Sequence, residues 1–316
     1  MIYTVVSVLL VFAILLYFRI ADRYNIIDKP NERSSHSSVT IRGGGIIFPI
    51  AILLWFLFFG FQYPWFTLGV LLISVISFLD DILTLSTKPR LAIHLLSVAL
   101  LMYDLGIYSF PAYWWIIAFV LIIGWINAFN FMDGINGITA FYAISVLIPV
   151  GVYNMMQEVL PLSLILISAI SAVIFAFFNA RKKAKTFAGD VGSVSMAFII
   201  AFLLITIILA TGRWEFICFV AVYGVDAVLT IIHRLSKKEN IFKPHRSHLY
   251  QYLANEMKVP HIGVAALYAF LQLMISFVVI KLIDSQLLPL VAFSILVVLS
   301  VIYTFAKSRI LRTIKA

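Results

Sequence analysis

The sequence predicts an all-α protein that crosses a membrane about eleven times and carries its functional site on the cytoplasmic face. Three observations lead to this prediction. The 316-residue chain is 63% hydrophobic and has a mean hydropathy of +1.07, which is far above the values of soluble domains. Its apolar residues form long runs, and its basic residues gather between alternate runs. The whole chain, 1–316, is expected to form one multi-span domain.

Eleven apolar runs are each near the length that a bilayer-crossing helix requires. They cover approximately 2–19, 43–61, 66–80, 91–104, 111–128, 138–154, 160–179, 192–210, 214–233, 262–281 and 287–305. The first run lacks a basic segment before it and a small-residue cleavage site after it, which favours a retained span over a signal peptide. The lone cysteine, Cys218, lies inside an apolar run, so it is expected to be a core residue without a disulfide.

Basic residues are confined to alternate loops. The formal net charge of +9 could by itself indicate a nucleic-acid binder. If the N-terminus lies outside, however, all of the 23 Lys and Arg residues except Arg213 and Lys281 fall on the inner side. The positive-inside rule then predicts a cytoplasmic C-terminus and cytoplasmic basic loops, and it removes the need for a nucleic-acid partner.

The first cytoplasmic loop, 28–45, combines basic residues with a run of three glycines. Arg33, His36 and Arg42 could face an anion, and the glycines around Gly44 would let the backbone approach a ligand closely. A solvated loop that only satisfies the positive-inside rule would account for the arginines as well.

Two adjacent carboxylates, Asp80 and Asp81, follow at the inner end of the third run. Adjacent acids repel unless a cation holds both, and oxygen ligands of this kind suit Mg²⁺ or Mn²⁺. Alternatively, the two acids are hydrated at the interface and pair with Lys88 or Arg90. These two basic residues could instead bind a phosphate that also contacts the metal.

The segment 127–139 interrupts the hydrocarbon with Asp133, Asn130 and other side-chain amides. Gly134 and Gly137 predict a helix break between the fifth and sixth runs, where irregular backbone must line a cavity. Because an unpaired polar group in lipid costs several kcal/mol, this cluster needs partners, water or a ligand. Asp133 is therefore a candidate site residue.

Three further polar elements lie on the same predicted face. Asp190, between Gly189 and Gly192, is either a site carboxylate or a helix-capping residue. Asp226 is expected to pair with Arg234 or His233, in a structural or a functional role. His245, Arg246 and His248 could bind phosphate, since no Cys or further His is near enough to complete a zinc site. The remaining histidines, His94 and His261, are expected to be structural.

Five motifs occur in one order along the chain: Arg-Ser-Ser-His with Arg-Gly-Gly-Gly, Asp80-Asp81, Asn-Ala-Phe-Asn-Phe-Met-Asp-Gly, Gly-Asp-Val-Gly-Ser and His-Arg-Ser-His. Together they resemble the polyprenyl-phosphate N-acetylhexosamine-1-phosphate transferase family. The His-Arg-Ser-His form resembles bacterial initiating transferases for O-antigen, capsule or enterobacterial-type glycans more than the peptidoglycan enzyme. One departure is Asn136, where the family often has a second Asp.

The resemblance implies transfer of a sugar-1-phosphate from a UDP-N-acetylhexosamine to undecaprenyl phosphate in the bacterial inner membrane. It implies release of UMP and a need for Mg²⁺, or Mn²⁺ in its place. Asp190 would be the metal ligand, and Asp80 and Asp81 would support the metal and the lipid phosphate, with the identity of the base left open. The resemblance assigns Arg90 to a phosphate. It assigns further residues to the nucleotide and metal pocket or to the diphosphate and sugar: Asn130, Asp133, Asn179, His245, Arg246 and His248.

A secondary transporter is the alternative from another class, because broken helices and buried acids also mark ion and substrate sites. That alternative predicts acids near the bilayer midplane and an inverted repeat, whereas the acids here gather at the inner ends of the runs. The sugar, the pathway and the oligomeric state, including a homodimer, are left open by the sequence.

Overall fold

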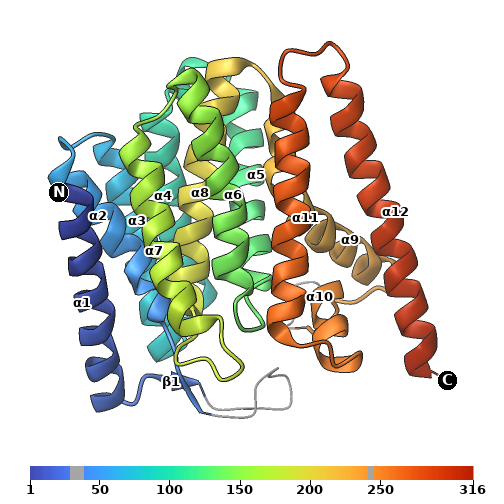
Figure 1. Cartoon of the computed structure of the whole chain (residues 1–316), viewed down its shortest axis with the longest axis horizontal. Helices are drawn as coiled ribbons and strands as arrows, with labels where there is room; N and C mark the ends of the chain where they lie inside the picture. The colour runs from blue at the N-terminus through green and yellow to red at the C-terminus, as the bar shows by residue number, and fades with distance from the viewer. Residues whose placement is uncertain (29–38, 241–244, 316) are drawn as a thin grey trace.

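The computed structural model describes residues 1–28, 39–240 and 245–315 and forms an upright bundle of antiparallel helices (Figure 1). The all-α prediction is confirmed. The elements are α1 (Ile2–Arg23), β1 (Ile27–Asp28), β2 (Thr40–Ile41), η1 (Gly44–Ile46), α2 (Ile47–Phe58), α3 (Pro64–Leu83), α4 (Thr87–Asp104), η2 (Ile107–Ser109), α5 (Ala112–Phe131), α6 (Ile138–Gln157), α7 (Leu162–Asn179), α8 (Gly189–Thr211), η3 (Trp214–Val220), α9 (Ala221–Ser236), α10 (Leu249–Gln251), η4 (Tyr252–Glu256), α11 (His261–Lys281) and α12 (Leu288–Lys315).

Each of the eleven predicted spans coincides with a helical element, but not all of these elements are equally suited to crossing a bilayer. Within the described residues, nine helices are long and apolar enough, with η3 and α9 taken together as Trp214–Ser236. The run 43–61 forms a shorter apolar helix, Gly44–Phe58. The run 91–104 lies in α4, whose 18 residues include two basic residues and one acid.

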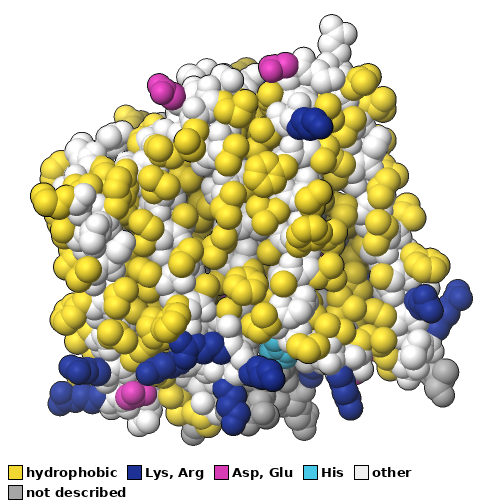
Figure 2. Space-filling view, viewed as in Figure 1, with side chains coloured by type: hydrophobic (Ala, Val, Ile, Leu, Met, Phe, Trp, Pro, Cys, Tyr) yellow, Lys and Arg dark blue, Asp and Glu magenta, His cyan; other side chains and the backbone are white. Residues whose placement is uncertain are grey.

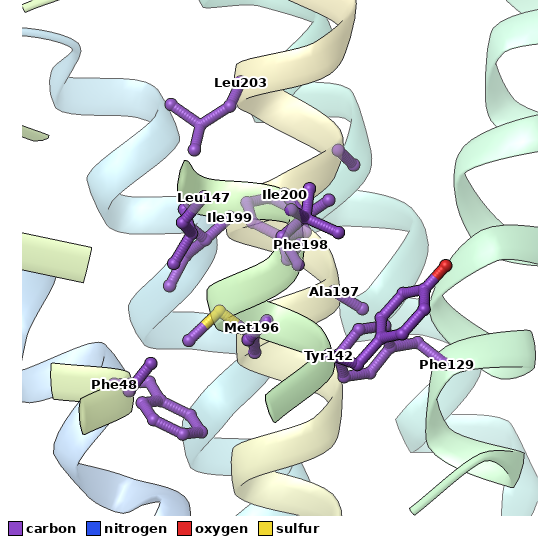
Figure 3. Close-up of a cluster of buried hydrophobic side chains, with 14 of the residues drawn as sticks. Phe48, Phe129, Tyr142, Leu147, Met196, Ala197, Phe198, Ile199, Ile200 and Leu203 are labelled. Atoms are coloured by element: carbon purple, nitrogen blue, oxygen red, sulfur yellow. The ribbon is translucent and has the colours of Figure 1, made fainter. Parts of the chain in front are cut away.

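The centre of the bundle is α8, which packs against α3, α5 and α6. Buried apolar side chains surround it on several sides (Figure 3). Phe198 and Phe202 stack on Phe66 of α3, with ring centroids 6.0 and 4.0 Å apart. In lipid, helices associate through close packing of this kind, because hydrocarbon surroundings provide little hydrophobic driving force. The first turn of α8, which contains Asp190, is therefore anchored to a tightly packed helix.

Basic side chains gather at one end of the bundle, here called the basic face (Figure 2). At this end α1, α3, α5, α7, α9 and α12 finish and α2, α4, α6, α8 and α11 begin. All the predicted site motifs that the structure describes lie at these helix ends or in the loops between them. Assignment of the basic face to the cytoplasm stays a prediction of the positive-inside rule.

Two short elements shape the basic face next to α8. β1 pairs antiparallel with β2, and Ile41 of β2 also forms a parallel bridge to Thr186, just before α8. This places Arg42 beside the start of α8. The predicted helix break is confirmed, since α5 ends at Phe131 and α6 begins only after Gly137, whose φ of +85° favours glycine.

Candidate active site

A cavity of about 410 Å³ opens at the basic face, where the α5–α6 break meets the start of α8. It combines carboxylates, side-chain amides, a guanidinium and an imidazole. Five of the predicted site residues line it: Arg42, Asn130, Asp133, Asn179 and Asp190. The rest of the lining is Asp28, Gly134, Ile135, Asn136, Phe187, Gly189, Gln251 and His261.

Asp81 lies outside the described lining of this cavity but holds two of its lining elements, the start of α8 and Arg42. Its buried carboxylate accepts hydrogen bonds from the backbone N–H groups of Asp190 at 3.0 Å and Val191 at 3.1 Å. It thus caps the N-terminus of α8 from a neighbouring helix, where the helix dipole favours negative charge. The same carboxylate pairs with the Arg42 Nε at 2.8 Å. Asp81 therefore fixes both α8 and Arg42.

Arg42 brings a positive charge into the cavity. Its Nη2 lies 3.9 Å from Asp190 Oδ1. Burial alone would lower the pKa of the guanidinium, but the nearby carboxylates of Asp81, Asp190 and Asp28 raise the pKa above its ordinary value. Arg42 is thus a permanent cation, and its side chain is still 35% exposed to the cavity.

Asp190 does not cap its own helix, so the structure does not support the interpretation of this residue as a helix cap. No side-chain hydrogen bond caps α8 at Ala188, and Asp81 occupies two of the free N–H groups. The Asp190 carboxylate instead lines the cavity, with 24% of its side chain exposed. It is available to a ligand there.

Asp133 is the second carboxylate in the cavity. It lies in the irregular segment between α5 and α6 and accepts a hydrogen bond from the Thr139 hydroxyl. Burial raises the pKa of this carboxyl to about 6, and the Thr139 hydrogen bond opposes the shift. Nearby, the Asn130 side-chain oxygen accepts a hydrogen bond from the Ser193 hydroxyl at 2.7 Å. The cavity therefore contains side-chain oxygen atoms from α5, from α8 and from the segment between α5 and α6.

Two other amides in the lining hold the scaffold together. Asn179 accepts a hydrogen bond from the N–H of Gly137 at 2.7 Å and donates one to the Thr186 carbonyl at 2.9 Å. Asn136 donates to the Arg181 carbonyl at 2.8 Å. Substrate binding by Asn179 stays a prediction, since its amide is already used twice within the protein.

Gly44, predicted to let the backbone approach a ligand, packs closely against Thr186 and Phe187 in this structure. The N–H of Gly44 donates to the Phe187 carbonyl at 2.9 Å, and a Cβ at Gly44 would lie 2.4 Å from the Thr186 side chain. Gly44 is absent from the described lining of the cavity. Arg33, the other loop residue predicted to bind substrate, lies outside the described residues.

Asp80 pairs with a different cation from its neighbour Asp81. Its carboxylate pairs with Arg90 and accepts a hydrogen bond from the backbone N–H of Leu85 at 2.7 Å. Neither Asp80 nor Asp81 belongs to the described lining of the cavity. Metal binding and base catalysis by these two acids, and phosphate binding by Arg90, stay predictions.

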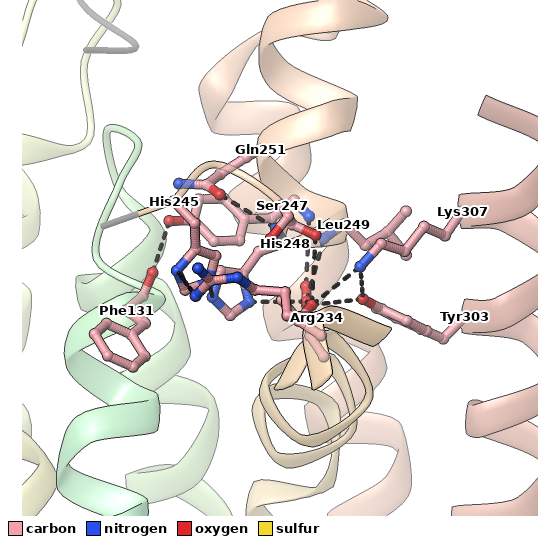
Figure 4. A network of polar contacts seen from close by, with 12 residues as sticks. Phe131, Arg234, His245, Ser247, His248, Leu249, Gln251, Tyr303 and Lys307 are labelled. Atoms are coloured by element: carbon pink, nitrogen blue, oxygen red, sulfur yellow. Dashed lines mark hydrogen bonds and ion pairs between the residues drawn. The ribbon is translucent and has the colours of Figure 1, made fainter. Parts of the chain in front are cut away.

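The segment 245–248, here called the histidine loop, lies in a network of polar contacts (Figure 4). The buried carboxylate of Asp226 holds this loop in place. Asp226 accepts hydrogen bonds from the Tyr268 hydroxyl at 2.7 Å and from the backbone N–H groups of Leu249 and Tyr250 at 3.1 and 3.4 Å. Its Oδ1 is also 3.1 Å from His248 Nδ1. Five such contacts, with Thr230 as the fifth at 3.3 Å, explain how a carboxylate tolerates full burial.

The predicted pairing of Asp226 with Arg234 or His233 is wrong. Arg234 pairs instead with Glu239 at 3.0 Å and contacts His245 Nδ1 at 2.7 Å. A helix-spacing argument on α9 could not foresee this, because the histidine loop folds back against that helix and supplies closer partners.

The histidine loop adjoins the cavity without lining it. His245 and His248 lie 5.7 and 6.3 Å from the Phe131 ring at the end of α5. The backbone N–H of His248 donates to Gln251 Oε1 at 3.2 Å, and Gln251 lines the cavity. Among the described residues, no group of three or more His, Cys, Asp or Glu side chains could hold a metal ion.

Sequence reasoning missed three polar residues of the cavity: Asp28, Gln251 and His261. His261 was expected to be structural, and its Nδ1 does accept a hydrogen bond from the N–H of Asn136 at 3.4 Å, yet the residue also lines the cavity. His261 directly follows Pro260 and begins α11 at the basic face. This position could have indicated a site residue.

Replacing Asp226 by Asn should destabilise the protein by about 2 kcal/mol, because one amide cannot satisfy the donors that the carboxylate serves. Thermal unfolding in detergent would measure the loss. Asp284→Asn, an exposed acid at the opposite end of the bundle, is the matched control and should leave the transition unchanged. Equal transitions for both variants would contradict the role assigned to Asp226.

Comparison with known proteins gives one family and several relatives. Residues 63–208 match the model of glycosyl transferase family 4. The chain is 28% identical over 261 residues to a probable undecaprenyl-phosphate N-acetylglucosaminyl 1-phosphate transferase of Bacillus subtilis, covering 74% of this chain and 71% of the relative. It is 26% identical over 185 residues to the phospho-N-acetylmuramoyl-pentapeptide-transferase of Streptococcus mutans and 28% identical over 184 residues to that of Streptococcus pneumoniae serotype 2. These last two alignments span 53% and 56% of the relatives.

Proposed function

Since the chain belongs to the family of polyprenyl-phosphate hexosamine-1-phosphate transferases, we propose that it transfers a sugar-1-phosphate from a UDP-sugar to undecaprenyl phosphate. The sugar is of the N-acetylhexosamine type, the products are undecaprenyl-diphosphate-sugar and UMP, and the step initiates a cell-surface glycan. The names of the relatives support the acceptor and the sugar-phosphate transfer, and the motifs support the initiating role.

The observation that carries this proposal is the composition of the cavity at the basic face. Asp133, Asp190 and the Arg42 guanidinium line one space of about 410 Å³. Attack of one phosphate on another brings negative charges together, so a site for this reaction needs cations for the phosphates and carboxylates for a metal. A lipid-borne phosphate lies at the membrane surface, and the cavity opens at the ends of the spans.

The donor set fits Mg²⁺. This ion prefers oxygen ligands and is often bound by one or two carboxylates together with substrate phosphates and water. Asp190 and Asp133 would hold the ion, and the Asn130 side-chain oxygen is a further donor in the same lining. When bound, Mg²⁺ would neutralise charge on the reacting phosphates. Mn²⁺, with the same preference for oxygen ligands, could replace it.

The protein's own groups have distinct roles in this proposal. Arg42, fixed by Asp81, binds a phosphate oxygen of the nucleotide diphosphate as a charge-assisted donor. Asp81 acts through Arg42 and α8, and is thus a positioning residue. His245, Arg246 and His248 contact the diphosphate and sugar end of the donor from the histidine loop. The loop from 234 to 258 selects the sugar.

The test is release of UMP by the purified protein in detergent, with undecaprenyl phosphate and a panel of UDP-N-acetylhexosamines. Release with one donor would establish the reaction and identify the sugar. Absence of release with every donor, in a folded sample that also fails to bind UDP-sugars, would refute the proposal and favour the transporter alternative.

Chelation provides the metal test of the same reaction. With EDTA in excess over Mg²⁺, UMP release should fall to background, and it should return when Mg²⁺ is restored in excess. The reason is that without a divalent cation the phosphates and the two cavity carboxylates repel one another. Unchanged turnover in EDTA would exclude the proposed role of the ion.

A further inference from the structure

Lys307 of α12 is a buried cation outside the cavity described above. The residue is 4% exposed, and its ammonium donates hydrogen bonds to the Tyr303 hydroxyl at 2.6 Å and the Thr230 hydroxyl at 3.2 Å. Within the described part of the chain, no carboxylate pairs with it directly. A charged group buried near a membrane with only neutral partners is costly, and such groups commonly mark a site for an opposite charge.

A pocket of about 470 Å³ between α9 and α12 has Lys307 in its lining. Its polar lining residues are basic or neutral. The basic ones are Lys307, Arg312 and His233, and the hydroxyl-bearing ones are Ser236, Tyr303, Thr304 and Ser308. No acid belongs to the described lining. The pocket therefore has the charge and the donors that bind an anion such as a phosphate group.

The pocket continues into an apolar groove along the outer side of α12. Thr304 and Ser308 line both, and the groove extends past Val301 to Val297. Val301 is 63% exposed, and the neighbouring Phe305 is 67% exposed, as expected for side chains that face lipid. A ligand that filled both spaces would have an anionic head at the basic face and a hydrocarbon chain directed into the bilayer.

We propose that the pocket between α9 and α12 binds the phosphate headgroup of an anionic bilayer phospholipid, with Lys307 and Arg312 as its charge partners and α12 as the surface for an acyl chain. The bilayer lipid is favoured over the polyprenyl phosphate acceptor, because this pocket shares no described lining residue with the cavity that contains Asp133 and Asp190. An acceptor phosphate in this pocket would not lie in that cavity.

Occupancy of this pocket would also stabilise the histidine loop. Lys307 and Tyr303, both labelled in Figure 4, contact Thr230. The Thr230 hydroxyl lies 3.3 Å from Asp226 Oδ1. Asp226 in turn binds the backbone N–H groups of Leu249 and Tyr250. An anion on Lys307 holds α12 against α9 and so supports the carboxylate that fixes the loop. This coupling does not depend on the proposed reaction.

The experiment measures lipid binding to the intact protein in nanodiscs of neutral phosphatidylcholine with an increasing fraction of phosphatidylglycerol. Bound phosphatidylglycerol is counted by native mass spectrometry. Arg312→Gln should weaken binding about fivefold, the effect of one cation near a charged membrane surface, and Lys307→Gln should weaken it further. Arg309→Gln is the matched control, because Arg309 is exposed on the same helix but does not line the pocket. It should bind like the wild type.

Three outcomes would overturn the proposal. Equal weakening in Arg309→Gln and Arg312→Gln would mean diffuse attraction to the surface. Preferential binding of undecaprenyl phosphate, or displacement of the lipid by inorganic phosphate at equal concentration, would assign the pocket to another source of phosphate. Because Arg312 is exposed, Arg312→Gln remains informative even if Lys307→Gln fails to fold.

Hydrogen exchange tests the coupling separately. The amides of Leu249 and Tyr250 should exchange more slowly as phosphatidylglycerol is added to the wild type, and this response should be lost in Arg312→Gln. Binding without any change at these two amides would overturn the coupling to the histidine loop.

Discussion

Asp190→Asn is expected to reduce UMP release by roughly 10³-fold, comparable to the loss when an enzyme's main electrostatic contact with the transition state is removed. The substitution keeps the shape of the side chain but removes the charge that faces the cavity. Because Asp81 caps α8 through backbone N–H groups, and Asp190 does not cap its own helix, the fold should persist. Turnover and thermal unfolding are measured on the same sample.

Asp22→Asn is the matched control for this variant. Asp22 is an exposed acid in the last turn of α1, also at the basic face, so its loss changes the net charge equally. Turnover of this control should equal that of the wild type. If Asp190→Asn retained activity within tenfold of the wild type, a difference of only about 1.4 kcal/mol in the barrier, Asp190 could not be the principal metal ligand.

Gly45→Ala is expected to destabilise the fold by about 3 kcal/mol, the upper end of the usual cost of overpacking. A Cβ at Gly45 would lie 2.2 Å from the Cα of Gly192 and 2.8 Å from the Ala188 carbonyl oxygen. Both neighbours are backbone atoms, which cannot rotate away. Since this contact joins η1 to the first turn of α8, the displacement would also move Asp190 and Arg42. Thermal unfolding and UMP release should both fall.

Gly192→Ala tests the same contact from the other side. In a helix, Ala is favoured over Gly by about 1 kcal/mol, but a Cβ here would lie 2.6 Å from the Cα of Gly45, so the clash should prevail. Gly124→Ala in α5 is the control, because its Cβ would meet nothing within 4 Å. That variant should be unchanged or more stable. A stabilised Gly192→Ala would show that η1 and α8 can separate without cost.

The sequence by itself determined the fold class, the positions of the apolar helices and the helix break before Ile138. In lipid, a long apolar run must satisfy its backbone hydrogen bonds internally, as a helix does. Hydropathy therefore predicts where the helices lie, and the glycine positions predict where a helix breaks. The sequence also predicted that the described motifs lie at one end of the bundle. Successive spans run in opposite directions, and the basic residues fall in alternate loops, so these loops share one face.

Only the tertiary structure decided which partner each polar residue of the basic face contacts. Asp80 and Asp81 are neighbours in the chain, yet Asp80 pairs with Arg90 and Asp81 caps α8 and fixes Arg42. Adjacent residues on a helix point in different directions, so their partners depend on which helices pack against each side. Asp226 likewise found its partners in the histidine loop and not on α9. These choices come from contacts between segments far apart in the sequence, which no local pattern encodes.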